Sequence, residues 1–143
     1  MEMKNKDCDC LSKIMLLPCS GACLEGQLSN QAAVELTNEG FGEMFCLAGI
    51  GAGKPGFVQS ARDVPRMVVI DGCDTACAKA ILEKYGIRVT NHVVVSRLAI
   101  DKCQGVKPAP EDIAAVKHSV KLASGEPVRV TFHTPKPLSP GDR

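Results

Sequence analysis

Tryptophan is absent from this chain of 143 residues, and other aromatic residues are scarce, with one Tyr and four Phe. Apolar residues nevertheless make up 45% of the sequence. A core built from them must be aliphatic, which is typical of a parallel sheet covered by helices. The length suits a single domain of roughly 100–150 residues with its own core.

The chain also lacks a strong charge of either sign, because 17 basic and 16 acidic residues leave a net charge of +1. No strong field is available to attract nucleic acid or anionic lipid. Apolar runs stay far below the ~20 residues that cross a bilayer. Residues 1–7 contain no apolar signal-peptide core. We therefore expect a cytoplasmic protein that binds neither nucleic acid nor membranes.

Short apolar runs predict a series of strands that alternate with amphipathic helices. The expected strands are residues 13–18, 43–47, 66–70 and 91–96, with a further edge strand at 128–132. The expected helices are residues 27–36, 57–63, 75–85 and 111–122, and segment 48–56 is expected to be a glycine-rich turn. In the helix at 75–85, the side chains of Ala76, Ala80 and Ile81 are expected to face inward.

This alternation predicts an α/β fold: a three-layer, doubly wound, Rossmann-like domain whose sheet is mainly parallel and has about four strands. Residues 1–12 are expected to form a flexible amino terminus that carries Cys8 and Cys10. Residues 13–123 form the domain, and the Pro-rich segment 124–143 is a carboxyl-terminal extension.

Cysteine, in contrast, is plentiful, with eight residues. Cys19, Cys46 and Cys73 are separated by intervals of 27 residues, and each closes a short apolar run. A strand and its crossover helix take about 30 residues, so this interval places one thiol at the carboxyl end of each successive strand. The carboxyl ends of the strands form the edge where open parallel sheets bind ligands. Cys77 adds a thiol one helical turn beyond Cys73. In a cytosolic chain, such a cluster favours a soft-metal site or a thiol redox site over structural disulfides.

The spacing does not decide between these two chemistries. Asp74 is expected to cap the helix that carries Cys77, and the positive end of a helix favours a thiolate. A thiolate serves a metal ligand and a nucleophile equally. Cys46 fits this cluster least well. A thiol that lies two strands from another is ~10 Å from it, so the loop after the strand must curve to bring the Cys46 sulfur to the others.

A second motif, G-x-G-x-x-G at residues 51–56, matches the pattern of a dinucleotide-binding turn. Pro55 removes one of the backbone amides that such a turn offers to phosphate, so we expect no dinucleotide to bind. His92, His118 and His133 are expected to be surface or capping residues, and His92 is the best-placed catalytic candidate because it opens a strand.

Several motifs together resemble a known family. They lie at residues 18–21, 26–30, 44–51, 57–61, 69–73 and 77–78, and read PCSG, GQLSN, MFCLAGIG, FVQSA, VIDGC and CA. In this order they are similar to the DGC-domain family of small prokaryotic α/β proteins. The family takes its name from the triplet found here as Asp71, Gly72 and Cys73.

The resemblance implies zinc binding through four cysteines, without an established activity. The matching positions are Cys19, Cys46, Cys73 and Cys77. Cys23 is a further candidate, because members of the family often carry a second cysteine soon after the first.

We therefore expect a metal-binding protein whose cofactor is zinc, with another soft metal or an iron–sulfur cluster as alternatives. The rival hypothesis is a cysteine-dependent thiol oxidoreductase or transferase that uses Cys73 or Cys77 as its nucleophile. A third is a protein-interaction module that docks a partner on its glycine-rich loop. The expected partner is a metal ion, and a protein partner or a homodimer is left open.

Overall fold

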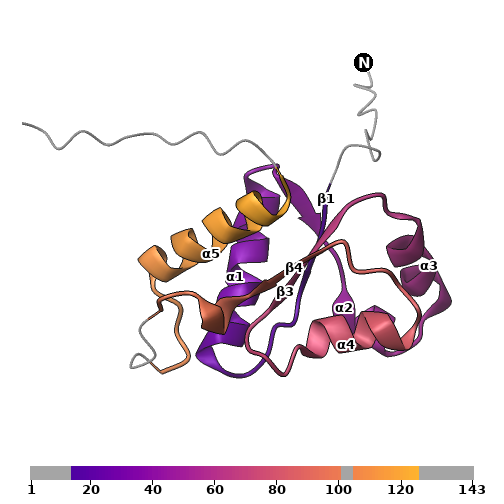
Figure 1. Cartoon of the computed structure of the whole chain (residues 1–143), viewed down its shortest axis with the longest axis horizontal. Helices are drawn as coiled ribbons and strands as arrows, with labels where there is room; N and C mark the ends of the chain where they lie inside the picture. Colours follow the sequence, from indigo (N-terminus) through magenta and orange to yellow (C-terminus); the bar gives the residue numbers. More distant parts are fainter. Residues whose placement is uncertain (1–13, 101–104, 126–143) are drawn as a thin grey trace, which may run out of the picture.

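The computed structural model describes residues 14–100 and 105–125. Its sheet has four parallel strands in the order β2-β1-β3-β4 (Figure 1). They are β1 (Ile14–Pro18), β2 (Gly42–Met44), β3 (Met67–Asp71) and β4 (Asn91–Val94). The predicted parallel sheet of four strands is thus confirmed. The predicted strand at 128–132 lies outside the described residues.

Helices follow the strands along the chain. They are α1 (Leu24–Asn38), α2 (Leu47–Gly51), α3 (Pro55–Asp63), α4 (Cys77–Lys84) and α5 (Pro110–Ala123), with a 3₁₀ turn at Val95–Arg97. Among the described residues, we find no helix with both the length and the apolar character that a bilayer crossing requires.

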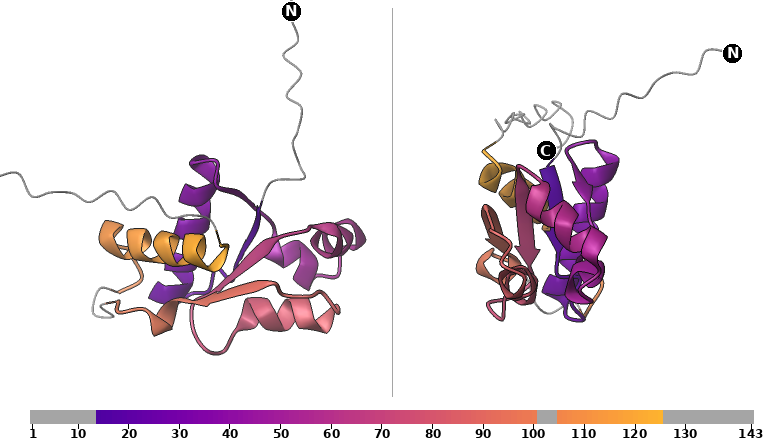
Figure 2. Two further views of the ribbon diagram at one scale, coloured as in Figure 1. Left: turned by 45° about the horizontal axis from the view of Figure 1, so that its top comes forward. Right: turned by 90° about the vertical axis from the view of Figure 1, so that its right-hand side faces the viewer.

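Two aliphatic cores lie on opposite faces of the sheet and make the fold three-layered. Figures 1 and 2 show α1 and α5 covering one face, with α3 and α4 on the other. Side chains of β1 alternate between the two cores, since Leu16 packs under α1 and α5 while Leu17 packs under α2, α3 and α4. Both leucines are fully buried. The predicted three-layer α/β architecture is therefore confirmed.

Segment 45–51 differs from its prediction, which extended a strand to residue 47 and then placed a turn. The strand β2 ends at Met44, and α2 begins at Leu47. Leu47 and Ile50 are both buried in the same core. Residues three apart share a face of a helix but not of a strand, so burying both side chains requires a helical turn here.

Helix α4 also differs from its prediction. It begins at Cys77 rather than at residue 75, and the residues that it buries are Ala78 and Leu82. Ala80, which was predicted to face inward, is exposed, and Ile81 is only half-buried. The helix thus turns Ala78 and Leu82, not Ala80, toward the core.

Candidate thiol site

The carboxyl ends of β1 and β3 form the centre of the candidate site. These two strands are neighbours, and the backbone N–H of Cys19 donates a hydrogen bond to the carbonyl oxygen of Ile70, at 2.9 Å. From β1 the chain continues into α1 on one face of the sheet, whereas from β3 it continues into α4 on the other. Such a divergence opens the crevice where doubly wound sheets bind ligands.

A hollow of about 200 Å³ lies in this crevice, and four of the nine residues that line it are cysteines. The lining consists of Cys19, Gly21, Cys23, Asp71, Gly72, Cys73, Thr75, Ala76 and Cys77. Cys19 and Cys73 are partly buried, whereas Cys23 and Cys77 are exposed. We call this feature the thiol hollow.

The Cys19 thiol takes part in a chain of hydrogen bonds. The backbone N–H of Gly72 donates to its sulfur at 3.3 Å, and the sulfur lies 3.5 Å from the Ser29 hydroxyl. Ser29 donates its single proton to the carbonyl oxygen of Gly26, at 2.7 Å. The thiol of Cys19 is therefore the donor toward Ser29, and its sulfur is held in a fixed place between α1 and the β3–α4 turn.

Asp71 anchors the β3–α4 turn from beneath. Its carboxylate is 1% exposed and accepts hydrogen bonds from the backbone N–H groups of Ala78 and Lys79, at 2.8 and 3.2 Å. These are two of the amides that a helix leaves unpaired in its first turn. Asp71 thus caps α4 from seven residues away, and by doing so fixes the first residue of the helix, Cys77.

The prediction that Asp74 caps this helix is wrong. Asp74 is exposed and instead forms an ion pair with Arg97, whose Nη2 lies 2.6 Å from Oδ1 of Asp74. The residue at the cap position is Ala76, whose φ of 52° lies in the left-handed region. An ordinary cap has extended backbone, so Ala76 cannot supply one, and the buried carboxylate of Asp71 takes over the role.

His92 also contacts Asp71. Its Nε2 lies 2.8 Å from Oδ2 of Asp71, and the side chain is 22% exposed. Since His92 is the second residue of β4, this contact ties the edge strand to the turn that carries Cys73 and Cys77. His118, in contrast, is exposed on α5, and His133 lies outside the described residues.

Gly72 allows α1 to approach this turn. A Cβ atom on Gly72 would lie 2.6 Å from the backbone nitrogen of Gly26, and a Cβ on Gly26 would lie 2.5 Å from the carbonyl oxygen of Gly21. Real Cβ atoms do not come so close to backbone atoms. Gly26 and Gly72 therefore let the loop after β1, the first turn of α1 and the β3–α4 turn meet backbone to backbone.

Strained backbone flanks two of the thiols. Ser20, next to Cys19, and Ala76, next to Cys77, both have positive φ although neither is glycine. Such residues cost of order 1–3 kcal/mol each and persist where their surroundings hold them. Ser20 is held by its hydroxyl, which donates to Oδ1 of Asn30 at 2.9 Å.

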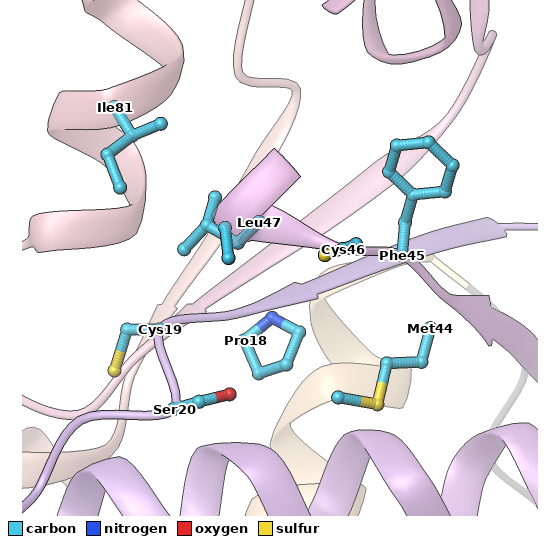
Figure 3. Close-up of a pocket in the computed structure, with 9 residues that line it drawn as sticks. Pro18, Cys19, Ser20, Met44, Phe45, Cys46, Leu47 and Ile81 are labelled. Atoms are coloured by element: carbon cyan, nitrogen blue, oxygen red, sulfur yellow. The ribbon is translucent and has the colours of Figure 1, made fainter. Parts of the chain in front are cut away.

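Cys46 lies apart from the thiol hollow. It precedes the first residue of α2, is exposed, and lines a separate hollow of about 390 Å³. Figure 3 shows Cys19 and Cys46 among the residues that line this hollow. Cys19 also lines the thiol hollow and is the residue that the two hollows share. The structure thus gathers Cys19, Cys73 and Cys77 with Cys23 around one hollow, and Cys19 with Cys46 around the other.

The remaining thiols, those of Cys8, Cys10 and Cys103, lie outside the described residues. Within residues 14–100 and 105–125, no three Cys, His, Asp or Glu side chains are grouped closely enough to hold a metal ion as they are placed. The thiol hollow thus offers sulfur atoms that can act as metal donors, but these atoms do not form a closed coordination shell.

The glycine-rich segment is occupied by contacts within the protein. Gly51 ends α2, and its carbonyl oxygen accepts a hydrogen bond from the Tyr85 hydroxyl at 3.2 Å. Gly53 has a φ of +68°, and a Cβ there would lie 3.0 Å from the same hydroxyl. A dinucleotide-binding turn leads from a strand into a helix, whereas this segment joins two helices.

Ser29 and Gly26 were not predicted from the sequence as parts of the site, although both lie in the motif at residues 26–30. Ser29 reaches the Cys19 sulfur across ten residues, and Gly26 matters through a contact with a segment 46 residues away. Neither contact leaves a periodic or capping pattern in the sequence.

Comparison with known proteins gives two matches. The DGC domain matches residues 15–120, a range that holds all five cysteines of the two hollows. The anaerobic and virulence modulator AnvM of Pseudomonas aeruginosa is 32% identical over 91 residues, which cover 64% of this chain and 70% of AnvM. No solved structure matches.

Proposed function

This chain belongs to the DGC domain family, and from that membership and the thiol hollow we propose that it binds a soft metal ion, zinc in the simplest case. The observation that carries the proposal is the convergence of four cysteines on one hollow of about 200 Å³, two from the loop between β1 and α1 and two from the β3–α4 turn and the start of α4. Zinc takes four ligands in tetrahedral geometry, and thiolate sulfur is among those it prefers.

The donor set fits zinc, although the side chains must turn to reach it. Cys23 and Cys77 are exposed, so rotating their side chains toward the hollow removes no buried contact. Cys19 is already fixed by Gly72 and Ser29. We infer that Cys19 and Cys73 form the ordered half of the metal site and that the exposed thiols complete it.

The fourth ligand separates two versions of the proposal. The thiol hollow supplies Cys23, whereas the family resemblance implies Cys46. Cys23 lines the same hollow as Cys73 and Cys77, and Cys46 is joined to them only through Cys19. Cys19, Cys73 and Cys77 are common to both versions.

The experiment begins with protein purified under reducing, oxygen-poor conditions and analysed for bound metal. We expect about one soft metal ion per chain, because convergent thiols bind zinc tightly at neutral pH. Cobalt substitution should give intense thiolate charge-transfer bands. A fully reduced protein that takes up neither zinc nor cobalt contradicts the proposal.

Single substitutions then identify the ligands. Cys19→Ser, Cys73→Ser and Cys77→Ser should each weaken metal retention strongly, and Cys103→Ser is the control that should not. If Cys23→Ser loses its metal and Cys46→Ser retains it, the four ligands are the cysteines of the thiol hollow. The reverse pattern selects the set that the family resemblance implies.

Thiol redox chemistry is the second candidate, and the exposure of Cys23 and Cys77 favours it. An exposed thiolate can attack the disulfide of another molecule, which forms a mixed disulfide and releases one of the two partner sulfurs as a thiol; a second nearby thiolate can then displace the remaining partner and leave an internal disulfide. Mass-spectrometric mapping after treatment of metal-free protein with oxidised glutathione tests this candidate. A disulfide between two cysteines of the thiol hollow supports it, whereas uniform glutathionylation of exposed thiols does not.

The relative adds a cellular setting to the proposal. AnvM is named as an anaerobic and virulence modulator, and we extend that description to this chain as a cytoplasmic modulator whose metal or thiol state changes with oxygen supply. Comparing the metal content and thiol count of protein taken from aerobic and anaerobic cells tests this extension. Identical values under the two conditions contradict it.

A further inference from the structure

The hollow that holds Cys46 has a character of its own. It lies between the carboxyl ends of β1 and β2 and the helices α2 and α4 (Figure 3). Its volume is about 390 Å³, which falls within the range of roughly 300–1,000 Å³ typical of small-molecule sites. We call it the apolar hollow, because six of its nine lining residues are apolar: Pro18, Met44, Phe45, Leu47, Ala48 and Ile81.

No charged side chain lines the apolar hollow, as far as the described residues go. The polar lining consists of Cys19, Ser20 and Cys46, and the Ser20 hydroxyl is already used in its bond to Asn30. A charged ligand would lose its hydration without gaining a counter-charge, which is costly. A neutral apolar molecule would lose little and would bury surface against aliphatic and aromatic side chains.

Contacts within the protein keep one wall of the apolar hollow in place. The Phe45 ring packs against the ring of Phe57 on α3, with centroids 5.5 Å apart. The Phe45 side chain is thereby held toward α3. Figure 3 shows Ile81 projecting from α4 toward Leu47, and both side chains belong to the core beneath α2, α3 and α4. The hollow is thus a gap between supported walls.

From these observations we propose that the apolar hollow binds a neutral, largely apolar small molecule and holds it beside the thiols of Cys19 and Cys46. Cys19 borders both hollows, so a ligand in the apolar hollow contacts a residue of the thiol hollow. The inference goes beyond metal binding, since it requires no ion.

The test compares two maleimides on reduced, metal-free, full-length protein. N-phenylmaleimide is neutral and aromatic, and its counterpart carries a sulfonate in place of the phenyl ring. Peptide mass spectrometry follows the labelling of Cys46 and, as an internal control, of Cys77. Both thiols are exposed, but no large apolar side chain is among the residues that line the hollow of Cys77.

For each reagent, the measured quantity is the ratio of the labelling rate of Cys46 to that of Cys77. We expect this ratio to be about tenfold higher for the neutral reagent than for the charged one, because the phenyl ring is buried when the neutral reagent reacts with Cys46. Indole, a neutral competitor, should slow labelling of Cys46 and leave Cys77 unchanged. Equal preferences for the two reagents at Cys46, or no protection by indole, overturn the proposal.

A pair of matched variants locates the effect. Ala48→Trp places a large ring at the exposed rim of the apolar hollow and should abolish the preference of Cys46 for the neutral reagent. Ala80→Trp is the control, because Ala80 is also exposed on a helix but lines neither hollow. If both variants behave like the wild type, the proposal fails. Because every measurement uses metal-free protein, such a failure leaves the metal proposal untouched, and failed metal uptake leaves this one untouched.

Discussion

Three consecutive residues, Asp71, Gly72 and Cys73, perform three different physical tasks. The carboxylate of Asp71 caps α4 and contacts His92. Gly72 lets the first turn of α1 come within backbone contact. Cys73 supplies a thiol to the hollow that the other two residues shape. At the residue scale, the triplet therefore positions the cysteines of the thiol hollow and also supplies one of them.

Asp71→Ala should destabilise the protein by about 3 kcal/mol, because it removes a helix cap and leaves buried polar groups without their acceptor. Asp74→Ala is the matched control, since Asp74 is exposed and forms only a surface ion pair, worth less than about 1 kcal/mol. Urea unfolding measures both values. Equal losses in the two variants would show that Asp71 does not hold α4. Asp71→Asn should fall between them, because its amide oxygen can still cap the helix.

Gly72→Ala should destabilise the fold by about 1–3 kcal/mol, the usual cost of forcing extra volume into a packed contact. The new Cβ would meet backbone atoms of α1, which cannot swing aside as a side chain can. Gly56→Ala serves as the comparison, since nothing lies within 4 Å of a Cβ there and alanine favours a helix. Thermal unfolding that ranks Gly56→Ala as the more damaging change would refute this account.

At the element scale, the strands were the most predictable parts of the fold. The run Met67–Ile70 is buried on both faces, and continuous burial of this kind leaves a clear apolar run in the sequence. The start of α1 was predicted three residues late because Cys23, which precedes it, makes no side-chain cap hydrogen bond. The start of α4 was missed because its cap, Asp71, lies seven residues away, beyond the reach of any local capping pattern.

Helices α1 and α5 are joined by an ion-pair network that the sequence did not suggest. Lys117 on α5 contacts both Glu35 on α1 and Glu39, the residue at the carboxyl-terminal cap of α1. The hydrogen bond from Lys117 holds the pKa of Glu39 below its ordinary value of 4.5, and the bond to Glu39 raises the pKa of Lys117 above 10.5. Both shifts mean that the folded state favours the charged forms.

Lys117→Met should therefore lower the free energy of unfolding at pH 7 by up to about 1 kcal/mol, since the pair is partly exposed and screened. Because the pKa of Glu39 is depressed on folding, its contribution is present above pH 4.5 and is lost as pH falls through the folded value. The contribution of Lys117 is present below pH 10.5 and is lost as pH rises through its raised pKa. Urea unfolding from pH 7 to pH 3 should show the two proteins converging. Lys107→Met, at an exposed position, should show no such convergence.

At the scale of the whole molecule, the sequence predicted that the cysteines lie at the carboxyl edge of the sheet, but not that they are distributed between two hollows. The 27-residue spacing placed Cys19, Cys46 and Cys73 after successive strands, and the structure has them there. Strand order decides the rest. Because β1 lies between β2 and β3, Cys19 borders both hollows, whereas Cys46 and Cys73 end on opposite sides of it. No spacing within a single chain encodes that order.

Removal of residues 126–143 should leave both the fold and the metal content intact. The two cores and all five cysteines of the hollows precede residue 126, and the removed segment contains no cysteine. The cut must spare Ser124, whose carbonyl oxygen accepts a hydrogen bond from Nη2 of Arg66 at 2.7 Å.

A longer deletion, of residues 124–143, removes that link between the end of α5 and the start of the strand β3, so this shorter protein should unfold at a lower urea concentration. Cobalt titration and urea unfolding compare both truncated chains with the full chain. Loss of cobalt binding on removal of 126–143 would show that this segment supplies a ligand, and His133, its one histidine, would be the first residue to substitute.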